Sequence, residues 1–173
     1  MANTFTLIAS STVGSGGATT IDFTSIAATW TDLVLKFSFR TPNGGANYDR
    51  CDLQFNGDTG NNYSNRLLYG TGSSAGSDNS SASNSIRFFY ANAGASTSST
   101  FSNGEIYIPN YAGSTQKSAS MDSVTENNAT AAIAALNAGL WTGTSAITSI
   151  KIFDNSSTFS QYSTAYLYGV KNA

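Results

Sequence analysis

The clearest pattern in the sequence is an alternation of apolar and polar residues over positions 32–40. Its apolar members stand at every second position: Leu33, Leu35, Phe37 and Phe39. The positions between them are polar from Lys36 onward, with Val34 as the exception. Successive side chains of an extended strand point to opposite faces, so this alternation predicts a β-strand with one face in a core. Its other face, which carries Lys36, Ser38 and Arg40, is expected to be solvated.

Shorter apolar segments follow the same rule and are separated by turn signals rich in Gly, Pro, Asn and Ser. The further expected strands cover residues 4–10, 18–26, 50–55, 65–69, 86–90, 105–108, 115–126, 146–153 and 163–170. In all, roughly ten short strands are expected, the pattern of an all-β sandwich or barrel. We predict a single domain over 1–173, an antiparallel and jelly-roll-like β-sandwich.

Two segments are harder to assign. In 129–141 the alanines, with Ile133, Leu136 and Leu140 at helical spacing, favour a helix, and Gly139 is a candidate helix stop. The turn signal just before this segment favours instead a strand of a hairpin, which is the assignment we prefer. Residues 70–85 are almost all Ser, Gly, Ala and Asn, so we predict an exposed, mobile loop there.

Charged residues make up only 10% of the chain, whereas ordinary domains have roughly 25%. Neutral polar groups must then cover the surface, and such a surface can pack against another protein without stranding many charges. The net charge is −2 and the basic residues are scattered singly, which argues against nucleic-acid binding. No run has the length of a membrane span, and the N-terminus lacks the features of a signal peptide. We therefore expect a protein made in a cytoplasm that does not bind a membrane.

The absence of histidine excludes Ser-His-Asp and Cys-His catalysis, and Cys51 is the single cysteine, so ordinary zinc sites are excluded too. Cys51 alternates with other apolar residues and is expected to be buried. The only glutamates, Glu105 and Glu126, form a weak candidate for a glycosidase pair, because such carboxylates are usually solvated. Alternate residues in 56–62 loosely match a calcium loop, but the bidentate acid that closes such a loop is missing, and we favour an Asx-rich turn, which explains the same residues. We predict no enzyme activity, no cofactor and no metal.

Tyrosines are more numerous than a small core needs. Interfaces are enriched in tyrosine, sugars stack on such rings, and many tyrosines simply form the rim of a core. The sequence Phe88-Phe89-Tyr90 places large side chains on both faces of one strand, so Phe89 is expected to meet a second sheet or a neighbouring subunit. The candidate interface residues are Phe89, Tyr107, Tyr166 and Tyr168.

Short motifs in a characteristic order run nearly from end to end of the chain. They are Phe5-Thr6-Leu7-Ile8-Ala9-Ser10-Ser11, Thr29-Trp30-Thr31-Asp32-Leu33-Val34-Leu35, Phe55-Asn56-Gly57-Asp58, Tyr107-Ile108-Pro109-Asn110-Tyr111, Glu126-Asn127-Asn128-Ala129-Thr130, Gly139-Leu140-Trp141, Ala146-Ile147-Thr148-Ser149-Ile150 and Leu167-Tyr168-Gly169-Val170-Lys171. In this order the chain resembles a family of small virion structural proteins of tailed phages, especially cyanophages. That family usually has Ile in place of Val170.

The resemblance implies a β-sandwich on the outside of the virion, in one of two roles. The first is a capsid decoration (cement) protein that stabilises the head through protein–protein interfaces. The second is a receptor- or glycan-binding module of a tail or head fibre. The compact chain favours decoration. The partners implied are the major capsid protein or other virion proteins, further copies of the chain in a homotrimer and, in the second role, a host glycan.

Overall fold

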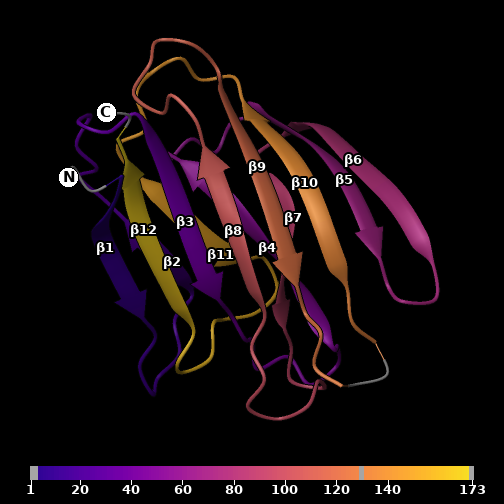
Figure 1. The fold of residues 1–173 in the computed structure, drawn as a ribbon. Coiled ribbons are helices and arrows are strands. Elements are labelled where there is room, and N and C mark those ends of the chain that lie inside the picture. The colour runs from indigo at the N-terminus through magenta and orange to yellow at the C-terminus, as the bar shows by residue number, and fades with distance from the viewer. Residues whose placement is uncertain (1–3, 129–130, 172–173) are drawn as a thin grey trace.

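A computed structural model describes residues 4–128 and 131–171, and in this part the chain forms twelve strands and no helix (Figure 1). The larger sheet has the order β1 (Phe5–Thr12), β12 (Thr164–Val170), β3 (Asp32–Ser38), β8 (Asn103–Ile108), β9 (Lys117–Val124), β10 (Ala134–Trp141), β5 (Tyr63–Gly70) and β6 (Ala75–Ser83). The smaller sheet has the order β2 (Thr20–Phe23), β11 (Ile150–Asp154), β4 (Tyr48–Phe55) and β7 (Ile86–Asn92). Neighbouring strands are antiparallel in both sheets.

Eight of the strands are connected as a jelly roll. The strands β1, β12, β3 and β8 belong to one sheet and β2, β11, β4 and β7 to the other. Along these eight strands the chain changes sheet at every step except from β4 to β7. Two hairpins are inserted into this order, β5–β6 before β7 and β9–β10 after β8, and both extend the larger sheet beyond β8. The predicted all-β, jelly-roll-like sandwich is confirmed.

The strand β3 lies inside the larger sheet and contributes to the centre of the core. Its inward residues Leu33, Leu35 and Phe37 are buried, as the alternation predicted. The Phe37 ring stacks on Phe39 with centroids 4.7 Å apart and contacts Phe89 of the smaller sheet at 5.4 Å. From the smaller sheet, three completely buried residues of β4 face the same core: Cys51, Leu53 and Phe55. Burial raises the pKa of the Cys51 thiol, so this side chain serves as a small apolar residue.

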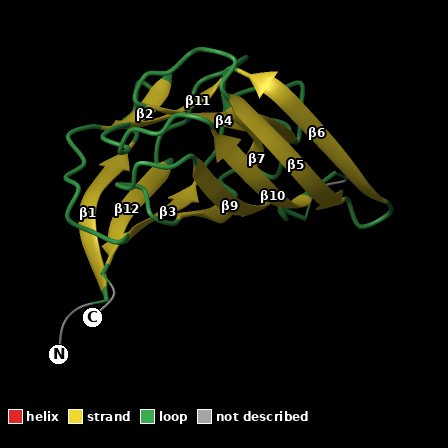
Figure 2. Ribbon diagram, turned by 90° about the horizontal axis from the view of Figure 1, so that it is seen from above, coloured by secondary structure: helices red, strands yellow, loops and turns green. Residues whose placement is uncertain are grey.

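The inserted hairpins curve around β7, which is an edge strand of the smaller sheet. In Figure 2 the larger sheet rises from β9 towards β6, so that β5 and β6 stand beside the smaller sheet. Side chains from the extension bind the free edge of β7: the Tyr90 N–H donates to Ser123 Oγ at 3.1 Å, and the Asn65 and Asn137 amides donate to the Arg87 carbonyl. Tyr90 of β7 packs in a small apolar cluster with Leu67, Ile133 and Ala135 of the extension. Unpaired strand edges are prone to non-specific pairing, and these contacts close this one.

Two assignments from the sequence are settled by the pairing of β5 with its neighbours. The segment 70–85 is not the predicted loop, because most of it forms β6, which pairs with β5. The turn between the two strands is closed by the Thr71 N–H, which donates to the Ser74 carbonyl at 2.9 Å. In 129–141, residues 134–141 form β10, so the strand assignment is confirmed there, while 129–130 lie outside the described residues. Gly139 is not a helix stop. A Cβ at this position would lie 2.7 Å from Ile86 Cγ2, so glycine permits β7 to approach β10 closely.

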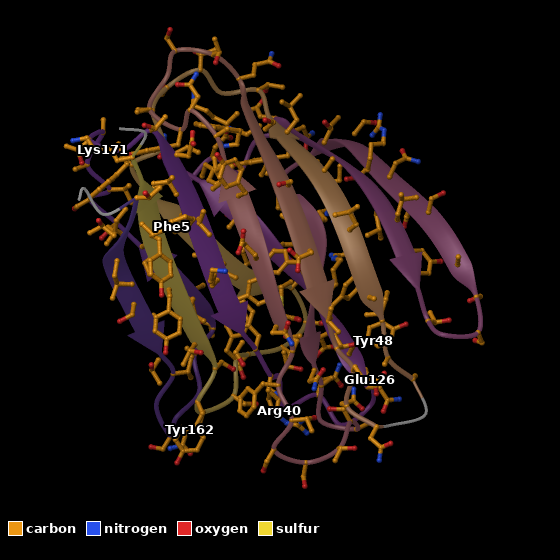
Figure 3. The ribbon with its side chains drawn as sticks, viewed as in Figure 1. Phe5, Arg40, Tyr48, Glu126, Tyr162 and Lys171 are labelled. Atoms are coloured by element: carbon orange, nitrogen blue, oxygen red, sulfur yellow. The ribbon has the colours of Figure 1, made fainter. Side chains whose placement is uncertain are left out.

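Arg40 follows β3 and does not have the solvated position that the alternation suggested. Its guanidinium donates to Ser96 Oγ at 3.0 Å and to the carbonyls of Thr97 and Thr100 at 3.0 and 2.9 Å. Figure 3 places Arg40 among the loops at the lower end of the sandwich. The planar fork of the guanidinium thus holds the loop between β7 and β8. No helix long and apolar enough to cross a membrane occurs in the described part of the chain.

Candidate interaction surface

The outward side of β12, β3 and β8 brings three of the four candidate residues together. In the register of these strands Val34 lies between Tyr168 and Tyr107, and Tyr166 lies on the next row beside Lys36. We call this surface the tyrosine face: Val34, Lys36, Glu105, Tyr107, Tyr166 and Tyr168. Val34 is buried although it points away from the core, because a tyrosine flanks it on each side. The exception in the sequence alternation therefore marks this surface.

The rings of the tyrosine face are held to different degrees. Tyr107 Oη donates to Asp32 Oδ2 at 2.7 Å, and Asp32 Oδ1 accepts the Asn110 N–H at 2.8 Å. The hydrogen bond to the carboxylate raises the pKa of the Tyr107 phenol. Tyr168 is half-buried, and Tyr166 is 39% exposed. The face thus combines one fixed ring with an exposed ring that is available for contact.

The charges on this side of the sheet largely compensate each other. Lys36 Nζ lies 2.5 Å from Glu105 Oε2, and the hydrogen bond to Glu105 raises the pKa of Lys36. Asp122 of β9 is the cross-strand neighbour of Glu105. Burial, and then repulsion by Glu105, raise the pKa of the Asp122 carboxyl. A partner that covers this face would meet a short ion pair and one carboxyl that protonates more readily than usual.

The structure does not bring Glu105 and Glu126 together as a glycosidase would require. Glu105 is opposite Asp122, whereas Glu126 follows the end of β9 and accepts the Asn128 N–H at 2.9 Å. Glu105 is bound by Lys36 on an open sheet face. General acid–base hydrolysis needs two carboxyls facing each other across the scissile bond. The arrangement of these two glutamates does not provide that geometry.

Phe89, the fourth candidate, belongs to the core. It is completely buried and contacts Phe37 of the larger sheet, so it meets a second sheet, one of the two environments expected for it. A second exposed apolar site on the extension was not predicted from the sequence: Leu68 and Leu136 lie opposite each other there and are 61% and 59% exposed. They line an open depression of ≈ 520 Å³. The signal for Leu136 was present in the spacing: once the segment is taken as a strand, Ala134, Leu136 and Ala138 share one face, and this face is the exposed one.

The oxygen-rich residues 56–62 serve the fold. Asn56 Oδ1 accepts the N–H groups of Thr148 and Ser149 at 2.8 and 3.1 Å. The Asp58 carboxylate accepts Trp141 Nε1–H at 2.7 Å and the Gly60 N–H at 2.8 Å. These side-chain oxygens are thus bonded within the chain, as in an Asx-rich turn. Over residues 4–128 and 131–171 there is no group of three or more His, Cys, Asp or Glu side chains that could hold a metal ion.

The outward side of the smaller sheet has a different character. The buried Asp52 accepts hydrogen bonds from Arg50 Nε at 3.0 Å, Ser85 Oγ at 3.0 Å and Asn155 Nδ2 at 2.6 Å, and Arg87 Nε lies 3.8 Å from it. Burial raises the pKa of the Asp52 carboxyl and outweighs the opposing effect of the arginines. The Asp52 carboxylate is therefore bonded within the chain, whereas the tyrosine face keeps an aromatic surface exposed for a partner.

No family model, curated protein or solved structure matches the chain.

Proposed function

We propose that the chain is a structural protein of a tailed-phage virion and that it acts as a capsid decoration protein. Its work would be to stabilise the head by covering neighbouring capsid subunits. The observation that carries this proposal is the tyrosine face, a broad sheet surface with aromatic rings and few uncompensated charges. The family resemblance and the jelly-roll connectivity, an architecture found among viral capsid and lectin domains, support the same role.

The chemistry of the tyrosine face suits binding to a protein. The cores of protein interfaces are enriched in aromatic residues and depleted of charge, since a charge without a partner is costly to desolvate. Tyr166 offers an exposed ring with a hydroxyl, and Lys36 and Glu105 already neutralise each other. A capsid surface that covered them would bury apolar area without stranding a charge.

The copy number of the chain in purified virions tests this role. A decoration protein occupies repeated sites over the whole head, so we expect hundreds of copies per virion by quantitative mass spectrometry. A few copies per virion, the number that a tail or fibre holds, would contradict decoration.

Binding of the purified protein to heads that lack it tests the surface. We expect Tyr166→Ala to weaken this binding at least about tenfold, the effect of removing a moderate interface anchor. The matched control is Tyr162→Ala, which removes a more exposed ring from a loop outside the tyrosine face. Equal losses in the two variants, or no loss in Tyr166→Ala, would count against the tyrosine face as the docking surface.

One observation favours the second role, a receptor- or glycan-binding module of a fibre. Tyr162 is 66% exposed in the loop before β12, where its φ of 72° projects the residue from a left-handed turn. Figure 3 places it at the lower end of the sandwich. An exposed ring at a loop end can stack on a sugar. Binding to host cells or to lipopolysaccharide that Tyr162→Ala abolishes would support this role, and silence on a glycan array would oppose it.

A further inference from the structure

The strand β1 forms one edge of the larger sheet and has a neighbouring strand only on its β12 side, as far as the described residues show (Figure 1). Two hydrogen bonds set the direction of its backbone groups: the Lys171 N–H donates to the Thr4 carbonyl at 3.1 Å, and the Val13 N–H donates to the Ser163 carbonyl at 2.9 Å. Backbone groups alternate in direction along an antiparallel strand, and the pairing shifts by one residue between Leu7 and Ala9. Four residues therefore direct their N–H and C=O groups away from β12: Phe5, Leu7, Ser10 and Thr12.

This edge lacks the features that usually protect an edge strand. Residues 4–13 contain no charge and no proline. Phe5 and Leu7 lie on the outward side of the sheet and are 52% and 51% exposed. Natural edges of this kind are blunted by charged residues or proline, because unpaired backbone groups beside apolar side chains attract another strand. The opposite edge, β6, has instead small polar residues and Asp78.

The free edge of β1 is complementary to itself. The outward-directed residues stand at positions 5, 7, 10 and 12, a spacing that is symmetric about the midpoint between Ile8 and Ala9. When a second β1 runs in the opposite direction, Phe5 faces Thr12 of the other copy and Leu7 faces Ser10. The one-residue shift between Leu7 and Ala9 in one strand then lies opposite the same shift in the other copy, so the register is continuous over the whole edge. Each facing pair can exchange two N–H···O=C bonds.

We propose that β1 pairs antiparallel with β1 of a second copy across a two-fold axis, so that two eight-stranded sheets become continuous. A second β1 fits this edge better than β6 of another copy. The outward-directed positions of β1 match those of a second β1, whereas β6 would bring the charged Asp78 to the apolar end of this edge. The contact is isologous, as in most two-fold dimers. It is independent of the proposed virion role.

The pairing also connects the tyrosine faces of the two copies. Leu7 is the cross-strand neighbour of Tyr168, and Ser10 is the neighbour of Tyr166, so the edge and the tyrosine face belong to one surface. A two-fold contact builds assemblies with an even number of copies, whereas the family resemblance implies a trimer. The mass of the particle in solution distinguishes these two arrangements.

Ser10→Pro tests the pairing without disturbing the chain itself. The Ser10 N–H points to the free edge, where proline is tolerated, so this substitution removes a donor that only the second copy uses. By light scattering and analytical ultracentrifugation we expect the wild-type protein to dimerise, or to form six copies if a three-fold contact is added. Ser10→Pro should lose the two-fold contact and keep the melting temperature that wild-type protein has when it is diluted to the monomer.

The matched control is Ser77→Pro on the opposite edge. Thr71 N–H bonds to the Ser74 carbonyl, and the alternation from that bond directs the Ser77 N–H to the free side of β6. We expect Ser77→Pro to leave the assembly unchanged. The proposal is overturned if wild-type protein stays monomeric at about 1 mM, if Ser10→Pro keeps the wild-type mass, or if both variants dissociate alike.

Disulfide cross-linking tests the register. In the proposed pairing Thr6 faces Ser11 of the second copy as a non-hydrogen-bonded pair, with Cα atoms about 4.5 Å apart, which is within disulfide range. We expect Thr6→Cys and Ser11→Cys proteins, mixed and oxidised, to form a mixed covalent dimer. Cys51 is completely buried and should not react. Equal cross-linking of either variant with itself would overturn this register.

Discussion

Asp58 connects the turn after β4 to the end of β10. Its carboxylate accepts the Trp141 indole N–H and the Gly60 N–H, while its carbonyl accepts Tyr63 Oη–H at 3.1 Å. The hydrogen bond from Trp141, followed by that from Asn62, lowers the pKa of this carboxyl below 3.8. Asp58 thus orients two buried aromatic rings whose centroids are 6.4 Å apart, Trp141 through its carboxylate and Tyr63 through its backbone carbonyl.

The lowered pKa makes the contribution of Asp58 dependent on pH. A carboxyl whose pKa is lowered by folding stabilises the folded state above its unfolded pKa, and this stabilisation is lost as the pH falls through the lower folded value. We expect Asp58→Asn to reduce the free energy of unfolding by about 1 kcal/mol at pH 7. The difference from wild type should shrink as the pH falls below 3.8.

Urea titrations over a pH series, followed by tryptophan fluorescence, measure this difference. Asp78→Asn is the control, because Asp78 is exposed on β6 and its carboxylate accepts the N–H of the following residue. A constant difference between wild type and Asp58→Asn down to pH 2 would show that the carboxylate charge does not matter.

At the scale of single residues, the sequence predicts burial well where side chains alternate and poorly where contacts are distant. The inward residues of β3 follow directly from their spacing. Arg40 continues the same alternation, but its hydrogen bonds reach a loop 56–60 residues further along the chain. Phe89 sits between two other aromatic residues, so alternation alone does not show which of them points inward. Such outcomes depend on tertiary neighbours that local spacing does not reveal.

At the scale of elements, β7 depends on side chains of other strands. Ser123 of β9 is buried, and its Oγ accepts the Tyr90 N–H, which the smaller sheet leaves unpaired. A buried donor without a partner costs about 1–3 kcal/mol. We therefore expect Ser123→Ala to lower the free energy of unfolding by about 1–2 kcal/mol in a denaturant titration.

Ser120→Ala provides a comparison on the same strand. Ser120 lies on the outward, exposed side of β9, so its loss should change stability by less than about 0.5 kcal/mol. If the two alanine variants were equally stable, the side-chain bonds at the β7 edge would have little energetic role.

Among the described strands, β6 was missed and β10 was ambiguous in the sequence, because neither has a clear alternating apolar pattern. The strand β6 consists of small, mostly polar residues, and only Ser83 in it is buried. It is a strand because β5 supplies a backbone partner, which needs no apolar side chain. In β10, the exposed Leu136 and the semi-exposed Leu140 give helical spacing by coincidence, while the inward residues at alternate positions carry the strand period. Pairing between strands decided both segments.

At the scale of the whole molecule, the jelly-roll strands and the inserted hairpins differ in how they are held. β3 lies between β12 and β8 and faces the main core, whereas β6 pairs with β5 alone and has mostly exposed side chains. Turn signals and strand count predicted a sandwich, but the order of strands depends on pairings far apart in sequence, such as β1 with β12. Because of these long-range pairings, a strand that pairs on both sides should have a higher local stability than an edge strand.

Hydrogen exchange measured by mass spectrometry can detect this gradient. Amides of β3 should exchange only through global unfolding, while amides of β6 should exchange through local opening of an edge, faster by orders of magnitude. The strand β10, which is inserted but pairs on both sides, is the internal comparison and should resemble β3 more than β6. If β6 exchanged as slowly as β3, the hairpin would unfold together with the sandwich. A second partner would then have to cover that edge, because the contacts of β6 with β5 alone do not explain such protection.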